Sequence, residues 1–539
     1  MRRFFGSLFL IVVAVMADAQ PMSSVEIDSL VGRTLRAFDV PGIAVCVIKD
    51  GQVVHSKGYG VRSLDTQQPV DEYTLFGIAS NSKAFTTAAL GMLVDEGKLS
   101  WDDKVRKYIP EFRLFDPYVT EEFTIRDLLC HRSGMGLGAG DLMFFPDSSD
   151  FTIPDILHNL QFLKPVTSFR STYAYDNNLY IVAGEVVARV SGMSWEDFIE
   201  KRIMAPLGMT HSAASYDRLR DSSDVIDGHA PVEGKVRVIA RSRSKVDHAA
   251  GGIYSCISDL SKWVILHLDG GKYGPDSTRL FSNAVWRERW APQTIIDVPG
   301  PGTYNTHFGA YALGFVVNDA RGYKQVSHTG GLEGMVTQIT MIPELRLGII
   351  VLTNQQEGLA FQAITNQIKD GYFGITGTDR VTQYAAIRKR QLAEAQHITD
   401  SIWHEVAAFQ TPPAAGRRGA SAGGVGRREA STGAVAARAD LTPYLGTYRD
   451  PWLGEIVISV KGGKPWFDSK RSPKLTGELL PYKGNSFVVK WRDRSMDADA
   501  YVIFSLDERG LANGIHMKPI SPLTDFSYDF QDLDFQREK

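Results

Sequence analysis

The first regular pattern of apolar and polar positions predicts a β-hairpin between residues 41 and 63. The run GIAVCVIK is followed by the turn Asp50-Gly51 and then by QVVHSKGYG. An Asp-Gly pair between two such runs is a strong signal for a tight hairpin turn. From Ala310 onward, strand-like runs separated by Gly, Asn or Pro follow one another: YALGFVVN, KQVSHTG, GMVTQITMI and RLGIIVLTN. These runs predict a cluster of strands.

Between the hairpin and this cluster, apolar residues recur at helical spacing. The spacing is present from Ala79 to Glu96, and Thr124 opens a capping-box-like start, TIRD. The segments NNLYIVAGEVVARVSG and DLSKWVILHLDGG end at Gly192 and at Gly270-Gly271, as helices commonly do. A final helical stretch runs from about Val381 to Phe409. This order predicts an α+β fold, an antiparallel sheet flanked by helices with an all-helical lobe.

The pattern changes after residue 410. Residues 411–440, TPPAAGRRGASAGGVGRREASTGAVAARAD, have no periodicity and almost no large apolar side chain, so they predict a flexible linker. Residues 441–539 are rich in aromatic and β-branched residues, as in EIVISVKGGKPWF, SFVVKWRDRS and AYVIFSLDERG. They predict a small all-β, barrel-like domain behind a first domain at residues 20–410.

The first residues, MRRFFGSLFLIVVAVMADAQ, have the features of a secretory signal peptide. Arg2 and Arg3 precede an apolar centre, and Ala17-Asp18-Ala19 forms a small-x-small cleavage site before Gln20. An uncleaved anchor is the alternative, but the apolar centre is short for a membrane span and no later stretch is long enough. We expect residues 1–19 to be removed and the protein to be exported, either to the periplasm or out of the cell.

Composition excludes some classes of function. The chain has 539 residues and a net charge of −3, which gives no electrostatic case for nucleic-acid binding. Its three cysteines, Cys46, Cys130 and Cys256, lie in apolar settings without a CxxC motif or a Cys/His cluster. We therefore expect buried free thiols, with neither a metal site nor a disulfide framework.

The first candidate catalytic motif is Ser80-Asn81-Ser82-Lys83. A serine hydroxyl needs an adjacent base to act as a nucleophile, and three-residue spacing on a helix places Ser80 and Lys83 on one face. Apolar neighbours can lower the pKa of the amine. The alternative is a helix cap followed by a surface lysine. A second S-x-x-K, at Ser242, has no apolar helix behind it, and a G-x-S-x-G at residues 419–423 lies in the predicted linker, so neither is a candidate nucleophile.

Two further motifs favour the interpretation of Ser80 as a nucleophile over that of a helix cap. Tyr175-Asp176-Asn177 offers a phenol that can relay a proton and an amide that can both donate and accept hydrogen bonds. His328-Thr329-Gly330, followed by Gly331, lies in a strand context. Glycines there let a substrate approach the strand edge, where a free N–H can help to form an oxyanion hole. Taken singly, the alternatives are a loop tyrosine and a hairpin turn.

Together and in this order, the three motifs resemble the active site of serine β-lactamases and penicillin-binding-protein-like hydrolases. The closer likeness is to the class C β-lactamase, esterase and D-aminopeptidase branch, and it runs from about residue 24 to 375. It includes VPGIAVCVIKDG, TIRDLLCHRSG, PLGM, AAGGIYSCISDLSKW and GIIVLTN. The C-terminal GTYRDPW and LTDFSYDFQDLDF resemble the lipocalin-like domain that some members append.

The resemblance implies a β-lactamase/transpeptidase-like fold and an acyl-enzyme mechanism without metal or organic cofactor. Ser80 would attack a carbonyl, Lys83 would take its proton and Tyr175 would relay protons. How Lys83 and Tyr175 share the role of base stays open. Asn177 would position the acyl side chain, and backbone N–H groups of Ser80 and Gly331 would hold the oxyanion. The resemblance places His328, Thr329 and Gly330 beside Gly331 in the substrate-binding strand.

One position departs from the pattern of classical β-lactamases and transpeptidases, because His328 stands where they usually have lysine. Histidine has an ordinary pKa of about 6.5 and is mostly neutral in neutral water. This favours a peptidase acting on small peptides, including peptides with D-residues, or an esterase. A class C β-lactamase or D-Ala-D-Ala carboxypeptidase is the alternative. A catalytically silent sensor of cell-wall peptides or lipophilic ligands is an alternative of another class, although it would need none of Ser80, Lys83 and Tyr175.

Overall fold

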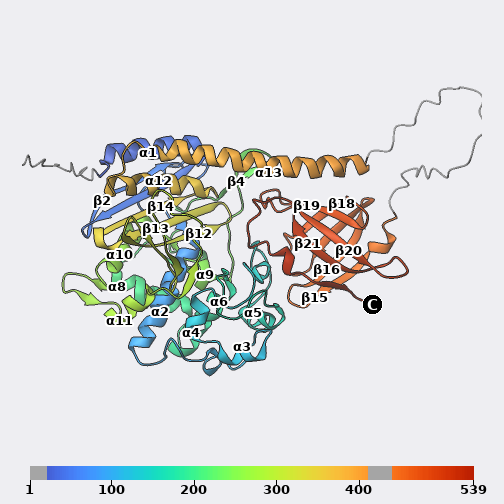
Figure 1. Ribbon diagram of the computed structural model, residues 1–539, viewed down its shortest axis with the longest axis horizontal. Coiled ribbons are helices and arrows are strands. Elements are labelled where there is room, and N and C mark those ends of the chain that lie inside the picture. The colour runs from blue at the N-terminus through green and yellow to red at the C-terminus, as the bar shows by residue number, and fades with distance from the viewer. Residues whose placement is uncertain (1–20, 411–439) are drawn as a thin grey trace, which may run out of the picture.

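The computed structural model describes residues 21–410 and 440–539 (Figure 1). The predicted signal peptide, and all of the predicted linker except Asp440, lie outside these residues. An eight-stranded antiparallel sheet with helices on both faces is followed by a closed eight-stranded barrel. The predicted fold class, a β-lactamase/transpeptidase-like fold followed by a small all-β barrel, is confirmed. Among the described helices, none combines the length and apolarity needed to cross a membrane.

The sheet has the strand order β2-β1-β14-β13-β12-β11-β10-β9. Its strands, in chain order, are β1 (Gly42–Lys49), β2 (Gln52–Gly60), β9 (Thr294–Ile296), β10 (Gly309–Tyr311), β11 (Val316–Ala320), β12 (Tyr323–Leu332), β13 (Met335–Ile342) and β14 (Leu347–Thr353). β1 and β14 lie side by side and are almost entirely buried, which explains their uninterrupted apolar runs. The run YALGFVVN divides between β10 and β11 rather than forming one strand.

Helices cover both faces of this sheet. α1 (Ser24–Phe38), α12 (Gly358–Tyr372) and the first part of α13 (Arg380–Gln410) pack on one face, and α10 (Ile257–Leu268) packs on the other (Figure 1). The sequence patterns described above anticipated α10 and α13 but not α1 or α12.

The helical lobe is built around α2, which is apolar on nearly all sides because it runs through the core. The capping box predicted at Thr124 is present, with Thr124 and Asp127 bonded reciprocally. The helices of the lobe and its borders are α2 (Lys83–Asp95), α3 (Pro117–Glu122), α4 (Ile125–Leu129), α5 (Ile153–Asn159), α6 (Asn178–Ser191), α7 (Trp195–Phe198), α8 (Ala205–Leu207), α9 (His248–Gly251) and α11 (Asn283–Arg289). Two-stranded pairs join β3 (Phe76–Gly77) to β6 (Tyr254–Ser255), β4 (His229–Val232) to β5 (Lys235–Val238), and β7 (Lys272–Tyr273) to β8 (Thr278–Arg279).

The barrel closes in simple chain order, each strand antiparallel to the next. Its strands are β15 (Gly446–Asp450), β16 (Gly454–Lys461), β17 (Lys464–Ser469), β18 (Thr476–Pro481), β19 (Ser486–Trp491), β20 (Ala500–Leu506), β21 (Ala512–Pro519) and β22 (Phe535–Arg537). Fully buried aromatic side chains, among them Phe467, Trp491 and Phe535, fill it. The likeness of this domain to lipocalins stays a prediction.

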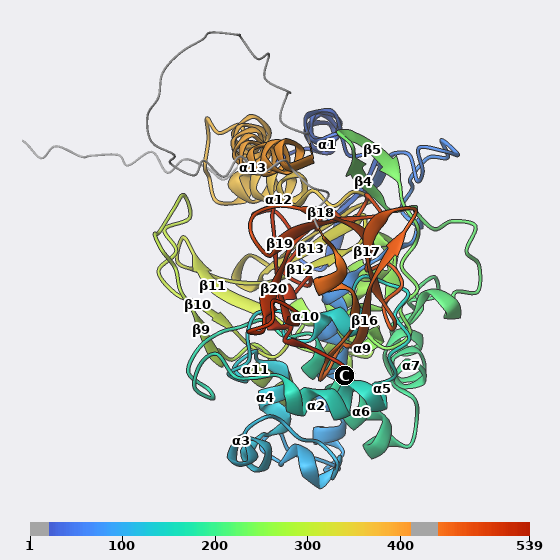
Figure 2. The ribbon, with the colours of Figure 1, turned by 90° about the vertical axis from the view of Figure 1, so that its right-hand side faces the viewer.

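The barrel packs against the first domain. The long helix α13 extends beyond the sheet to the barrel, where Ile402 and Val406 join an apolar cluster with Val488 and Ile520 (Figure 1). In Figure 2 the barrel faces the viewer and lies in front of the helical lobe and the sheet. The C-terminal strands thus stand beside the region where the sheet meets the helical lobe.

Candidate active site

Ser80 lies in a single 3₁₀ turn (Ala79–Ser82) that leads directly into α2. The preceding residue, Ala79, has φ +48°, a left-handed conformation that is uncommon outside glycine. The turn is held against β13, because Thr337 Oγ1 donates to the Ile78 carbonyl (3.0 Å) and accepts from Asn81 Nδ2 (2.9 Å). These bonds fix the position of the Ser80 side chain relative to the sheet.

Lys83 is completely buried, so the alternative of a surface lysine is wrong. Its Nζ lies 3.0 Å from Ser80 Oγ, 2.6 Å from Asn177 Oδ1 and 2.9 Å from the Ala250 carbonyl oxygen. Burial lowers the pKa of Lys83 to about 7, against the opposing attraction of nearby carboxylates. A neutral amine has two N–H groups and one lone pair. With the N–H groups on Asn177 and Ala250, the lone pair faces the Ser80 hydroxyl, as a general base requires.

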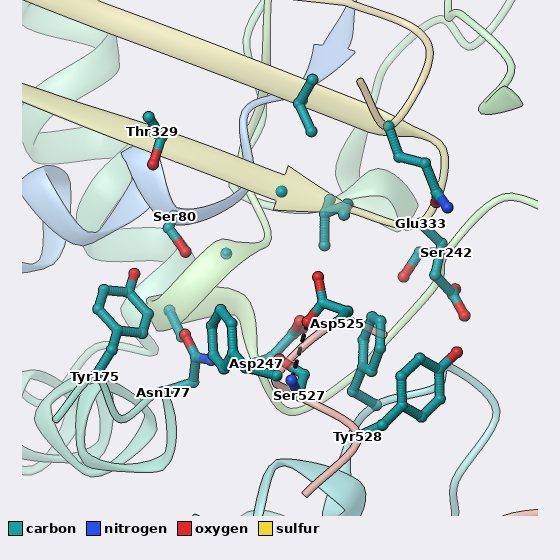
Figure 3. Close-up of a pocket in the computed structure, with 18 of the residues that line it drawn as sticks. Ser80, Tyr175, Asn177, Ser242, Asp247, Thr329, Glu333, Asp525, Ser527 and Tyr528 are labelled. Carbon is teal, nitrogen blue, oxygen red and sulfur yellow. Dashed lines mark hydrogen bonds between the residues drawn. The ribbon is translucent and has the colours of Figure 1, made fainter. Parts of the chain in front are cut away.

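Tyr175 lies in the loop before α6, and its hydroxyl is directed toward Ser80 (Figure 3). The buried hydroxyl has no hydrogen-bond partner among the described residues at the distances that define such a bond. Burial raises the pKa of Tyr175 well above its ordinary value, although the nearby Ser80 hydroxyl acts in the opposite direction. The phenol is therefore neutral and can relay a proton, and the buried Lys83 amine can accept one.

Asn177 is engaged at both ends of its amide. Its Oδ1 accepts from Lys83, and its Nδ2 donates to Asp141 Oδ2 at 2.8 Å. Because Nδ2 is held by Asp141 Oδ2, the amide presents its Oδ1 to the lysine. Asn177 thus orients Lys83. Its predicted contact with the acyl side chain of a substrate stays a prediction.

The four residues from His328 to Gly331 alternate along β12. Thr329 and Gly331 are exposed, whereas His328 and Gly330 are buried, although His328 also lines the pocket. A Cβ atom at Gly330 would lie 2.2 Å from the Ile78 carbonyl oxygen, so only glycine lets β12 pack this closely against the segment before Ser80. At Gly331 a Cβ atom would meet nothing within 4 Å. The strand therefore borders the site and leaves room for a substrate.

His328 is neutral in this structure. Its Nδ1 lies 2.5 Å from the Thr329 carbonyl oxygen and its Nε2 lies 2.8 Å from the Tyr311 hydroxyl, an arrangement in which Nδ1 carries the proton. Burial, with a smaller effect from Lys83, lowers the pKa of His328 to about 3. The expectation that position 328 offers no positive charge agrees with this geometry. The role of Tyr311 as its partner was not anticipated.

A pocket of about 490 Å³ opens at Ser80. Its described lining contains no lysine or arginine side chain and five carboxylates: Asp147, Asp247, Glu333, Asp497 and Asp525. Two of these, Asp497 and Asp525, come from the barrel. No local sequence pattern pointed to the barrel residues, and LTDFSYDFQDLDF was notable only for its resemblance to an appended domain. Ser242 also lines the pocket.

His131 and the three cysteines have structural roles. The Nδ1 atom of His131 accepts from the Asp176 N–H at 3.0 Å, and its ring packs 4.1 Å from that of Tyr175. The three cysteines are free and buried, as predicted.

Sequence comparisons relate both domains of the chain to known proteins. Residues 433–537 match a domain family of unknown function, DUF3471. An unguisins hydrolase of Aspergillus violaceofuscus is 29% identical over 387 residues, 67% of each chain. Protein flp of Staphylococcus aureus is 26% identical over 335 residues, 62% of this chain and 63% of the relative. The chain thus spans about two thirds of the first relative and slightly less of the second.

Two solved structures share the fold at low sequence identity. The octameric penicillin-binding protein homologue from Pyrococcus abyssi has a TM-score of 0.57 and 21% identity, with 95% of this chain and 100% of that one covered. A class C β-lactamase has a TM-score of 0.52 and 20% identity, with 65% and 95% covered. Residues 27–370, well over half of the chain, match the Beta-lactamase family. With the Ser80–Lys83 pair, Tyr175 and the β12 edge assembled at one pocket, the chain belongs to the beta-lactamase family.

Proposed function

We propose that this serine hydrolase cleaves amide or ester bonds of small peptides, including peptides with D-residues, or of small esters, through an acyl intermediate on Ser80. The observation that carries the proposal is the buried Lys83 amine, with a pKa lowered to about 7, at 3.0 Å from Ser80 Oγ. The name of the Aspergillus relative, a hydrolase, supports the reaction type.

In the proposed reaction, Lys83 takes the proton as Ser80 Oγ attacks the substrate carbonyl. Backbone N–H groups of Ser80 and Gly331 hold the negative charge that develops on the carbonyl oxygen. Tyr175 relays the proton held by Lys83 to the leaving group as the bond to that group breaks. A water molecule then attacks the acyl ester and gives a proton to the same pair of side chains. The pair returns this proton to Ser80 Oγ as the bond between Oγ and the acyl carbon breaks.

The charges around the pocket bear on the class of substrate. A substrate carboxylate would meet a neutral His328 and a lining rich in carboxylates. The neutral imidazole offers it no cation to pair with, and the ionised carboxylates of the lining repel it. The runner-up, a class C β-lactamase or a D-Ala-D-Ala carboxypeptidase, is favoured by the shared fold alone. A catalytically silent sensor would not need a buried Lys83 amine within hydrogen-bond distance of Ser80 Oγ.

His328→Lys tests this use of position 328. The lysine would place a cation at the pocket edge, and kcat/KM for carboxylate-bearing nitrocefin should rise about tenfold relative to p-nitrophenyl acetate. His307→Lys, which adds the same charge at an exposed position, is the control. An unchanged ratio in a folded His328→Lys protein would contradict the argument.

We also propose that the protein is exported. The proposal is supported by the charged start, apolar centre and Ala-Asp-Ala site in residues 1–19. Amino-terminal sequencing of the protein secreted by a bacterial host should begin at Gln20. Recovery with Met1 intact would contradict export with cleavage.

The proposed reaction is tested by covalent labelling. A fluorophosphonate should modify the native protein, and mass spectrometry of the digest should place the adduct on Ser80. A fluorescent penicillin used in parallel distinguishes the runner-up. An adduct on another side chain, or none on well-folded protein, would overturn the proposal.

A further inference from the structure

The phenol of Tyr175 is held by its surroundings rather than by a hydrogen bond at its hydroxyl. The hydroxyl is buried and has no hydrogen-bond partner among the described residues, and Tyr175 itself lies in the loop before α6. A group that passes a proton to a reacting atom must be held within a fraction of an ångström of its working position. The position of this ring must therefore be fixed by the backbone on either side of it and by the rings packed against it.

His131 holds the backbone on both sides of Tyr175. Its carbonyl oxygen accepts the Ala174 N–H, and its Nδ1 accepts the Asp176 N–H, each at 3.0 Å. In the same loop, HRSGMGLGAG, the Gly138 N–H donates to the Tyr175 carbonyl oxygen at 2.8 Å. The loop that begins at His131 thus fixes the peptide groups next to the phenol.

The imidazole ring of His131 also packs against the ring of Tyr175. The two ring centroids lie 4.1 Å apart, with an angle of 33° between the planes. His131 is completely buried, and the Tyr311 ring meets it edge to face at 4.3 Å, so it has little freedom to move. The Lys83 Nζ lies 4.8 Å from the centroid of the Tyr175 ring. The position of His131 therefore limits where the phenol can lie relative to Lys83.

The protonation and the backbone conformation of His131 both suit this contact. Since Nδ1 accepts the Asp176 N–H, the proton of the neutral ring is on Nε2. Burial, with smaller effects from Lys83 and His328, holds the pKa of His131 well below its ordinary value. The ring therefore stays neutral, and Nδ1 stays an acceptor. The φ of His131 is +56°, a left-handed conformation that asparagine and glycine also adopt readily.

We propose that His131 is a positioning residue for the reaction, which holds Tyr175 where its hydroxyl can give a proton to the leaving group. The described lining of the pocket does not include His131, so it acts through Tyr175 rather than on the substrate. This inference rests on the proposed function, because it takes Tyr175 as the proton relay. As the bond from the acyl carbon to the leaving oxygen breaks, that oxygen takes a proton from Tyr175, and protonated Lys83 replaces it.

Two acetate esters distinguish this role from a contribution to stability alone. Benzyl acetate and p-nitrophenyl acetate give the same acetyl ester on Ser80. Benzyl alkoxide must be protonated as it leaves, whereas p-nitrophenolate is stabilised by its nitro group and leaves without a proton. His131→Phe keeps an aromatic ring and loses the acceptor. It should lower kcat/KM about a hundredfold for benzyl acetate and less than about fivefold for p-nitrophenyl acetate.

Three further variants show whether His131 acts through Tyr175. His131→Asn places Oδ1 where Nδ1 lies and suits the left-handed backbone, so the ratio of the two kcat/KM values should stay within about tenfold of the native ratio. His131→Gly suits the same backbone without an acceptor, and it makes the same test as His131→Phe if phenylalanine prevents folding. In Tyr175→Phe protein, His131→Phe should change the ratio no further, because both substitutions affect one step.

His229→Phe is the matched control. His229 is also completely buried, and its Nε2 accepts the Leu64 N–H at 3.1 Å, but it does not line the described pocket. Its replacement likewise removes the acceptor of a backbone N–H, and the ratio for the two esters should keep its native value.

Equal loss of activity on both esters in folded His131→Phe or His131→Gly would overturn the inference. A ratio that falls as far in His131→Asn, or a further fall when His131→Phe is added to Tyr175→Phe, would also overturn it. Native protein that cleaves p-nitrophenyl acetate but not benzyl acetate would show that no proton reaches the leaving group, with the same consequence. Native protein that hydrolyses neither ester and is not labelled at Ser80 by a fluorophosphonate, whose fluoride leaves without a proton, would instead overturn the proposed function.

Discussion

Replacing Ser80 by alanine is expected to lower kcat for p-nitrophenyl ester hydrolysis by about a millionfold, as removal of a catalytic nucleophile does in serine hydrolases. The Lys83 lone pair faces only this hydroxyl, so its loss leaves the base with nothing to activate. The variant should fold normally, because the side chain lost is small. Stopped assays over several hours, with heat-inactivated enzyme as background, measure the residual rate.

Ser82→Ala is the matched control for this experiment. Ser82 lies in the same turn, but its buried Oγ accepts the Ile253 N–H at 3.1 Å and is directed away from the reaction. Its removal should cost about 1 kcal/mol of stability and leave kcat within about tenfold of the native value. Substantial hydrolysis by Ser80→Ala, above that background, would place the nucleophile elsewhere in the pocket, with Ser242 as the next serine to test.

The parts of the site that were predictable from the sequence are those encoded locally. Ser80 and Lys83 are three residues apart, and the requirement for glycine at position 330 follows from a strand that passes close to the nucleophile. The strands of the sheet were readable for the same reason, because β1 and β14 need apolar residues at almost every position. The capping box at Ser23 and Glu26, with buried residues at helical spacing, is a signal that could have identified α1.

The contribution of the barrel to the pocket lining was not predictable, because it depends on docking between distant segments. Ser527 and Asp141 are separated by 386 residues, and nothing local to either residue encodes their hydrogen bond. Tyr311 was missed for a similar reason, since it reaches His328 only after β10, β11 and β12 pair. His328 is also more deeply buried than the sequence indicated. The ordinary pKa of histidine suggested a mostly neutral side chain at position 328, whereas the structure holds that pKa at about 3.

Lys83→Met is expected to lower kcat/KM by about a thousandfold, within the usual contribution of a general base. The pH profile gives the sharper test. Since the Lys83 amine must be neutral to accept a proton and its pKa is lowered to about 7, kcat/KM of the native protein should rise with pH through about 7 and then level off. In Lys83→Met this rise should disappear from the residual activity. Lys98→Met, at an exposed lysine just beyond α2, should keep it.

Stability distinguishes loss of the base from loss of the fold. The pKa of Lys83 is lowered on folding, so between about pH 7 and pH 10 the unfolded state binds more protons and the free energy of unfolding rises with pH. Below this window the buried amine destabilises the native protein fully. Replacement by methionine removes that cost, and Lys83→Met should unfold at an equal or higher denaturant concentration at pH 7 while being nearly inactive. Residual activity that still rises through pH 7 would show that another group takes the proton from Ser80. A variant less stable than the native protein would instead show that the hydrogen bonds of Lys83 to Asn177 and Ala250 outweigh its cost of burial.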